Sequence, residues 1–266
     1  MKDTYLLAKR IRVNSLKMVA RANASHIASA LSISDILACL YGRVMTTFPE
    51  DPLHPERDRF ILSKGHGCVS VYATLHEMGF INKKDLATYG DDFSWLMNHI
   101  SHKVNGVEFS TGALGHGLPF AVGKSLSGKI RKKEFKSFVI LSDGEMDEGS
   151  NWEALMFAAH QKLDNLVAII DYNKLQSLDT IENTLGLEPL REKLLSFGCE
   201  VIEVDGHNHD AIVLSLNSNH QNKPKVVIAH TIKGKGVSFM EDSVQWHYKS
   251  PDENQLKTAI EEIENA

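Results

Sequence analysis

The chain has 266 residues, of which 42% are hydrophobic and 24% are charged, as in an ordinary globular protein with a substantial core. Its formal net charge of −5 gives no general attraction to nucleic acid or to an anionic membrane. The 3 cysteines contain no CxxC pair, so neither a disulfide framework nor a structural zinc site is indicated. We expect a cytoplasmic protein with no membrane span, because no apolar run approaches bilayer-spanning length.

The first quarter of the chain is predicted to be helical. Apolar residues recur at helical spacing from Leu6 to Val19, and the Ser34-Asp35 pair is typical of a cap that starts a second helix. The segment DRFILSKGHG predicts a short strand that ends in a Gly-His turn, followed by a helix across VSVYATLHEMG. Residues 90–114 show no clear period and are predicted to form a loop before a helix across LPFAVGKSL.

From Lys136 onward, β-rich runs alternate with helix-like stretches. The runs are KSFVILSD, NLVAIIDY, CEVIEVDG and KPKVVIAHT. This alternation predicts an α/β fold, in which a parallel sheet carries helices on both faces. No linker or repeat interrupts the chain, so residues 1–266 are predicted to form a single domain, with PDENQLKTAIEEIEN as an exposed amphipathic helix.

Polar residues stand at the end of each β-rich run: Asp143, Asp171 with Asn173, Asp205 and His230. In open α/β sheets, ligands bind beyond the carboxyl ends of the strands. We therefore expect these residues to line a common crevice.

The segment SDGEMDEGSNWEA, residues 142–154, crowds acidic residues between a strand and a helix. Like charges placed so closely repel unless water or a cation separates them. Asp143 followed by Gly144 suits a divalent metal that holds a phosphate, although acids at a helix N-terminus also favour the helix dipole. Asn173 follows Asp143 by 173 − 143 = 30 residues, one strand-helix-strand unit, which predicts two neighbouring oxygen ligands for Mg²⁺.

An Asp-Gly pair followed by an Asn one such unit later resembles the thiamine diphosphate fingerprint, and the whole chain resembles transketolase. The matching segments lie in the order of that family: SHIASALSISDILACLYG, DRFILSKGHG, GVEFSTGALGHGLPFAVG, SDGEMDEGSNWEA, NLVAIIDYNKLQ and AHTIKGKGVSFMED followed by WH. The chain resembles only the N-terminal, diphosphate-binding subunit of the split transketolases. In those enzymes a second chain supplies the pyrimidine-binding half and the C-terminal domain.

The resemblance implies a thiamine diphosphate-binding fold and a cofactor held by Mg²⁺, or by Ca²⁺ or Mn²⁺. The family's metal ligands match Asp143, Asn173 and the main-chain carbonyl of Leu175. Its other cofactor contacts match His66, Gly112, Leu114, Gly144, Glu148 and His247. The glycine-rich STGALGHG is also a turn that opens the following helix, so both roles remain open for it.

Histidines are expected around the reacting carbon, where they would move protons and stabilise alkoxides. The matching positions are His26, His66, His99 and His247. Each of them also fits a capping or packing role. The family's GHP is replaced by MNHIS, so Asn98 or His99 could occupy that position.

Two further groups of charges have alternative interpretations. Glu148 and Glu153 resemble an acidic pair at the family's subunit contact, or they form a solvated helix face. Lys233 and Lys235 in IKGKG are solvated charges, or they approach an anionic substrate group or hold a mobile loop. Ser142 also departs from the first glycine of the family's usual GDG.

The resemblance implies transfer of a two-carbon ketol unit from a ketose, expected to be phosphorylated, to an aldose. The glutamate that activates the cofactor lies on the pyrimidine-binding half, so we expect activity only with that second subunit, in a heterotetramer of two copies of each. The alternatives are another thiamine diphosphate enzyme subunit, of a ketoacid or deoxyxylulose-phosphate type, and a non-catalytic cofactor-binding partner.

Overall fold

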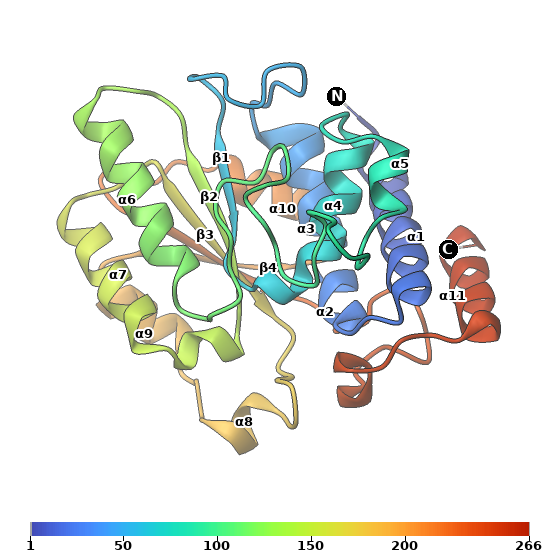
Figure 1. Cartoon of the computed structure of the whole chain (residues 1–266). Coiled ribbons are helices and arrows are strands. Elements are labelled where there is room, and N and C mark those ends of the chain that lie inside the picture. The colour runs from blue at the N-terminus through green and yellow to red at the C-terminus, as the bar shows by residue number, and fades with distance from the viewer. Residues whose placement is uncertain (1, 266) are drawn as a thin grey trace.

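The computed structural model describes residues 2–265, and the strands in this range form one parallel sheet. The sheet order is β1-β2-β3-β5-β4, and every neighbouring pair is parallel. The strands are β1 (Arg59–Leu62), β2 (Ser137–Ser142), β3 (Leu166–Tyr172), β4 (Glu200–Asp205) and β5 (Lys225–His230). The predicted parallel sheet is therefore confirmed (Figure 1).

Helices cover both faces of the sheet. Successive strand residues point to opposite sides, so the apolar side chains of each strand pack against helices on both faces. Phe138 and Ile140 pack into one apolar core with α1 (Thr4–Ala22), α2 (Ile27–Leu31), α3 (Ser34–Cys39), α4 (Cys68–Glu77) and α10 (His209–Asn217). Val139 and Leu141 pack into a second core with α6 (Gly117–Ile130), α7 (Gly149–His160) and α9 (Leu190–Ser196). Figure 1 shows these two groups of helices on opposite sides of the sheet.

The remaining helices lie outside these two layers. They are α5 (Lys83–Leu86), α8 (Ile181–Thr184) and α11 (Glu253–Asn265). The amphipathic pattern predicted for α11 is confirmed, because its buried residues Ala259 and Ile263 lie one helical turn apart. This helix packs beside α1 (Figure 1).

The helical stretch Ile27–Val44 corrects one expectation from the sequence. Its 18 residues have a mean hydropathy of 1.4, so by length and composition it is apolar enough to cross a membrane. However, 83% of this stretch is buried inside the protein, as in the core helix of a globular fold. Length and composition alone are therefore a weak indication of a membrane span here.

Asp35 is not the helix cap that the sequence suggested. The residue before α3 is Ile33, which makes no side-chain capping bond, and Asp35 is buried in the first turn of that helix. Its carboxylate instead accepts two hydrogen bonds from the Arg12 guanidinium, at 3.0 and 2.5 Å. It also contacts His207 Nδ1 at 2.7 Å and His209 Nε2 at 3.0 Å. The buried guanidinium holds the pKa of Asp35 well below its ordinary value, against the opposing effect of burial.

We predict that Asp35→Ala lowers the free energy of unfolding by about 3–5 kcal/mol, because it leaves the Arg12 guanidinium buried without its counter-ion. Asp210→Ala is the matched control. Asp210 pairs with Arg43 at the surface, with 85% of its side chain exposed, so we expect a loss of about 1 kcal/mol or less. Urea denaturation of both variants measures the difference, and equal losses would contradict this account.

Candidate functional site

A cavity of about 250 Å³ lies beyond the carboxyl ends of β1, β2, β3 and β5, and most of the predicted site residues line it. Those that do are His26, His66, His99, Gly112, Leu114, Asp143, Gly144, Asn173, Leu175 and His247. The lining also contains residues to which the sequence analysis gave no site role, among them Ser29, Lys64, Gln176, Ser177 and Tyr248.

Several residues expected at the site lie outside the cavity lining, among them Asp171, which is fully buried. Glu148 caps the start of α7 and is exposed. Asp205 ends the edge strand β4, which β5 separates from β3. His230 is exposed and pairs with Glu203 at 2.8 Å. The expectation that all strand-end residues line one crevice was therefore wrong for Asp171, Asp205 and His230.

The parallel register of β2 and β3 places Asp143 next to the segment that carries Asn173, because Ser142 pairs with Asp171. Asp143 is only 1% exposed, and its carboxylate accepts hydrogen bonds from the backbone N–H of Gly144 at 2.7 Å and of Lys174 at 2.5 Å. Burial and the nearby charge of Asp171 raise the pKa of Asp143 to about 7. A cation in the cavity would stabilise this carboxylate in its charged form.

The acidic residues of 142–154 do not act as one cluster. Glu145 is fully buried and accepts hydrogen bonds from Ser63 Oγ at 2.5 Å and from the N–H of Gly115 at 2.9 Å. It therefore ties the end of β1 and the loop before α6 to the end of β2. Asp147 accepts a hydrogen bond from Gln176 Nε2 at 2.8 Å. Only Asp143 of this segment presents its carboxylate to the cavity.

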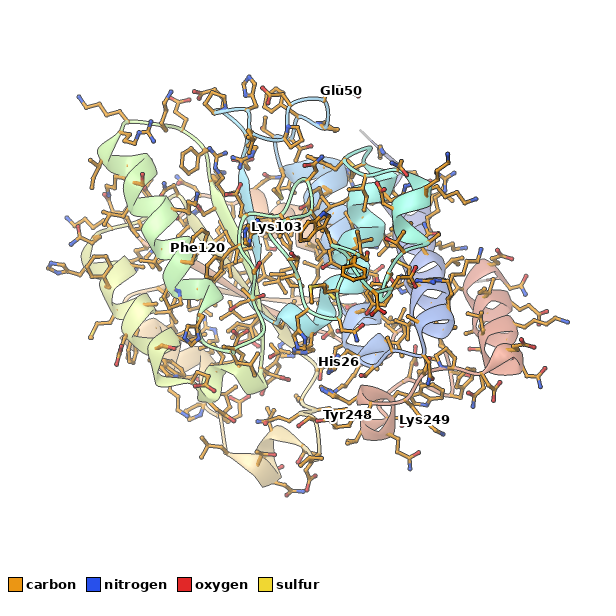
Figure 2. The ribbon with its side chains drawn as sticks, viewed as in Figure 1. His26, Glu50, Lys103, Phe120, Tyr248 and Lys249 are labelled. Carbon is orange, nitrogen blue, oxygen red and sulfur yellow. The ribbon has the colours of Figure 1, made fainter. Side chains whose placement is uncertain are left out.

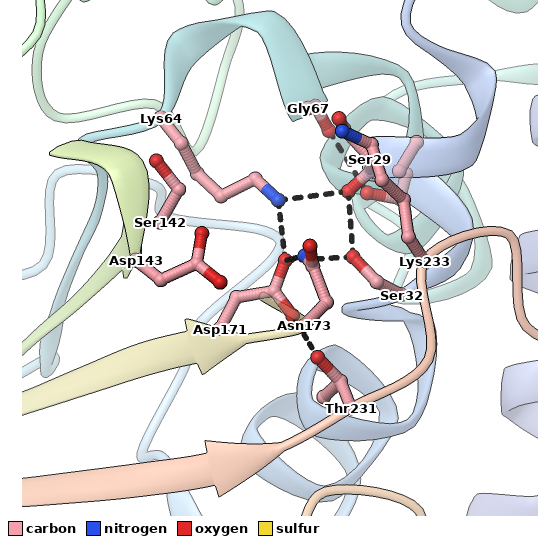
Figure 3. A network of polar contacts seen from close by, with 12 residues as sticks. Ser29, Ser32, Lys64, Gly67, Ser142, Asp143, Asp171, Asn173, Thr231 and Lys233 are labelled. Carbon is pink, nitrogen blue, oxygen red and sulfur yellow. Dashed lines mark hydrogen bonds and ion pairs between the residues drawn. The ribbon is translucent and has the colours of Figure 1, made fainter. Parts of the chain in front are cut away.

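Lys64 and Asp171 form a buried ion pair beneath the cavity (Figure 3). Their side chains are 1% and 0% exposed, and Lys64 Nζ lies 2.6 Å from Asp171 Oδ2. Burial by itself raises the pKa of Asp171, but Lys64 and further hydrogen bonds bring it below its ordinary value. The sequence signal for this pair was a charged residue shortly after each of two apolar runs, FIL before Lys64 and LVAII before Asp171.

The two lysines of IKGKG have different surroundings: one lines the cavity and the other does not. Lys233 is buried and donates hydrogen bonds from Nζ to the carbonyls of Leu175 at 3.1 Å and Gln176 at 2.7 Å. Burial and the nearby Lys64 lower the pKa of Lys233 to about 8. Lys235 lies outside the cavity lining and pairs with Glu241 at 3.5 Å. Of the two, Lys233 is the one placed to meet an anion in the cavity.

The four predicted histidines converge on the cavity. The ring of His26 lies 5.3 Å from that of His66, 5.7 Å from that of His99 and 5.0 Å from that of His247, measured between centroids. His99 lines the cavity and Asn98 does not. The residues thus come together from four separate parts of the chain.

These histidines are held in their neutral form. Burial lowers the pKa of His26 to about 4 and that of His247 to about 3, and it holds the pKa of His66 well below its ordinary value. Burial also lowers the pKa of His99. A neutral imidazole carries one N–H donor and one acceptor nitrogen, so each ring can donate one hydrogen bond and accept another near pH 7.

Two histidine nitrogen atoms and the backbone at Gly144 are available to contact a bound molecule. The Nδ1 atoms of His26 and His247 are buried and have no hydrogen-bond partner within residues 2–265. A Cβ on Gly144 would lie 2.9 Å from the Gln176 side chain, so this position favours glycine and leaves the backbone approachable. The Tyr248 side chain, which is 59% exposed, lies beside His26 (Figure 2). These features fit a ligand with anionic and polar groups.

Comparison with known proteins identifies the class of protein to which this fold belongs. Residues 4–263 match the family described as "Transketolase, thiamine diphosphate binding domain". The transketolase from Campylobacter jejuni has a crystal structure that superposes with a TM-score of 0.94 at 29% identity, covering 99% of this chain and 43% of that one. The chain therefore spans less than half of the solved transketolase. Its fold is that of a thiamine diphosphate-binding domain.

The chain belongs to the transketolase family. It is 44% identical over 261 residues to one subunit of the apulose-4-phosphate transketolase of Actinobacillus succinogenes, covering 97% of this chain and 95% of that protein. It is 38% identical over 265 residues to the 6-deoxy-6-sulfo-D-fructose transketolase subunit SqwG of a Clostridium species, covering 98% and 96%. The resemblance to the N-terminal subunit of a split transketolase is thus confirmed.

We predict that His26→Asn makes stability less dependent on pH between about 6.5 and 4. The pKa of His26 falls from 6.5 in the unfolded chain to about 4 in the folded protein. The unfolded chain therefore takes up the proton first, and stability present above pH 6.5 is lost as the pH falls toward 4. Asparagine tolerates the positive φ of 72° at this position.

Urea denaturation across this pH range measures how the free energy of unfolding changes with pH. In His26→Asn this slope should be smaller, by the equivalent of up to about one bound proton. His116→Asn, at an exposed histidine, is the control and should leave the slope unchanged. An unchanged slope in His26→Asn would show that burial does not keep His26 neutral.

Proposed function

We propose that this chain is the diphosphate-binding half of a transketolase that moves a two-carbon ketol unit from a ketose to an aldose. The observation that carries the proposal is the convergence of neutral histidines on a cavity that also holds Asp143 and Asn173. The names of the subunit relatives support a phosphorylated or sulfonated sugar as the donor.

The cofactor we propose for the cavity is thiamine diphosphate with Mg²⁺, for which Ca²⁺ or Mn²⁺ can substitute. Asp143, Asn173 and the carbonyl of Leu175 supply the hard oxygen ligands that such a cation prefers. When bound, the cofactor supplies the nucleophilic carbon for breaking and forming the carbon–carbon bond. The backbone of Gly144 and the ammonium of Lys233 lie where they can contact the diphosphate.

The four histidines carry out the proton movements in this proposal. Since they are neutral, each can accept a proton from a substrate hydroxyl, return that proton once the ring is protonated, or donate a hydrogen bond to a developing alkoxide. General acid–base catalysis of this kind contributes about 10²–10⁴-fold. The unpartnered Nδ1 atoms of His26 and His247, noted above for residues 2–265, are free for such contacts. Leu114 and Gly112 provide an apolar and a backbone surface beside the histidines for the pyrimidine ring.

A second subunit that carries the pyrimidine-binding half would complete the cavity, and we propose two copies of each chain. The subunit names of the relatives support such a partner. Glu153 on α7 is exposed next to Met156 and Phe157, which are 59% and 44% exposed. Exposed apolar side chains beside acids suit a protein contact. We place Glu148 and Glu153 at this contact, and residues 1–266 act as one domain.

We predict that this chain alone has no ketol transferase activity and that it gains activity with its partner subunit, thiamine diphosphate and Mg²⁺. The partner supplies the glutamate that activates the cofactor. The assay follows aldose release from ketose phosphates, with product analysis by mass spectrometry. Turnover by the isolated chain would contradict the proposal. Decarboxylation of a ketoacid would support the ketoacid type of enzyme, and cofactor binding without turnover would support a non-catalytic partner.

We predict that Asp143→Asn in the assembled enzyme weakens Mg²⁺-dependent binding of thiamine diphosphate by at least about tenfold, because it removes the charged metal ligand. Asp205→Asn is the matched control, since Asp205 also ends a strand but lies outside the cavity lining. Titration with thiamine diphosphate at several Mg²⁺ concentrations measures both. Normal binding by Asp143→Asn would rule out the proposed metal site.

A further inference from the structure

Asp171 has both carboxylate oxygens engaged by other residues (Figure 3). Thr231 Oγ1 donates to Oδ1, while Ser32 Oγ at 2.7 Å, Lys64 Nζ at 2.6 Å and Asn173 Nδ2 at 3.1 Å donate to Oδ2. The donors come from the ends of β1, β3 and β5 and from the turn between α2 and α3. Although it lies near Asp143, Asp171 is therefore not free to bind a cation.

The contact with Asp171 determines how the amide of Asn173 is oriented. Its nitrogen donates to Asp171, and its oxygen accepts a hydrogen bond from the N–H of Leu175 at 3.1 Å. A flipped amide would bring its oxygen against the carboxylate and its NH₂ against the Leu175 N–H. Both contacts would then be repulsive. The amide oxygen, which keeps a second lone pair, is thus the atom available to a cation.

Lys64 determines the charge at these strand ends. Its ammonium pairs with Asp171 and donates to the carbonyl of Ser29 at 2.9 Å. The pair cancels its own charge. Within residues 2–265, Asp143 is the one carboxylate of the cavity lining, and it forms no direct ion pair with Lys64 or with Lys233. A site with a single carboxylate, an amide and a carbonyl needs anionic oxygens from the ligand to hold a divalent cation tightly.

We propose that Lys64 and Asp171 are positioning residues of the cofactor site. Asp171 fixes the amide oxygen of Asn173 for the cation, and Lys64 neutralises Asp171 so that cation binding depends on the diphosphate. This dependence would keep the cavity from filling with free metal before the cofactor arrives. The inference rests on the metal site proposed above.

The test measures Mn²⁺ binding from the electron paramagnetic resonance signal of the free ion. It uses the full chain assembled with its partner subunit, with and without thiamine diphosphate. Lys64→Met exposes the cavity to the charge of Asp171, so Mn²⁺ without cofactor should bind more tightly by on the order of tenfold. Asp171→Asn loses the fixed amide, so cofactor-dependent Mn²⁺ affinity should fall by about 10–100-fold. These opposite changes cannot both come from a general loss of stability.

Lys225→Met is the matched control. Lys225 is also fully buried, but it lies at the opposite end of β5 and donates to the carbonyls of Ser215, Leu216 and Ser218. This variant should lose stability. The ratio of its Mn²⁺ affinities with and without cofactor should equal that of the unmodified protein. If it changes the ratio as Lys64→Met does, the specific role of Lys64 is overturned.

Thr231→Val decides the outcome if the charged variants do not fold. It removes one hydrogen bond to Asp171 without changing the charge, and it should weaken cofactor-dependent Mn²⁺ binding several-fold while leaving binding without cofactor unchanged. Cofactor-dependent Mn²⁺ binding that is unaltered in Thr231→Val, or in a folded Asp171→Asn, overturns the role of Asp171. Unaltered or weaker cofactor-free binding in a folded Lys64→Met overturns the role of Lys64. If the unmodified protein binds no Mn²⁺ with cofactor, the proposed metal site itself fails, and this inference with it.

Discussion

Two carboxylates, Asp143 and Asp171, are buried at neighbouring strand ends, and the rest of the site depends on how each charge is balanced. Lys64 balances Asp171 from within the chain, whereas the carboxylate of Asp143 keeps a raised pKa of about 7. The protein alone therefore satisfies one of the two charges. The cation proposed for this cavity would satisfy the other.

Another buried acid, Asp35, helps to hold the other side of the cavity in place. His207 contacts Asp35 through Nδ1 and accepts the N–H of Ile232 through Nε2 at 2.9 Å, while Arg12 Nε donates to the carbonyl of Lys235 at 3.1 Å. These bonds anchor the loop that carries Lys233 on both sides. The buried polar groups thus serve stability and the placement of the site together, because the same bonds hold the core helices and the loop.

The sequence predicted the strands, the parallel sheet and the neighbouring positions of Asp143 and Asn173, because these follow from apolar runs and from spacing along the chain. It did not predict the partners of buried charges. Asp35 has the local pattern of a cap, and only the packing of α1 against α3 shows that Arg12 reaches it. The place of β5 between β3 and β4 cannot be inferred from spacing either. Asp205 was therefore expected at the cavity although it ends the edge strand.

The position of β5 has a consequence for synthesis on the ribosome. β3 and β4 precede β5 in the chain, yet β5 lies between them in the sheet. Until residues 225–231 have emerged, β3 has an unpaired edge, and Asp171 lacks the hydroxyl of Thr231. A nascent chain released or stalled before this point would carry an open apolar sheet, which is prone to aggregation. The last strand to be made thus joins β4 to the rest of the sheet and brings Thr231 to Asp171, whereas Lys233, His247 and Tyr248 of the cavity lining follow it in the chain.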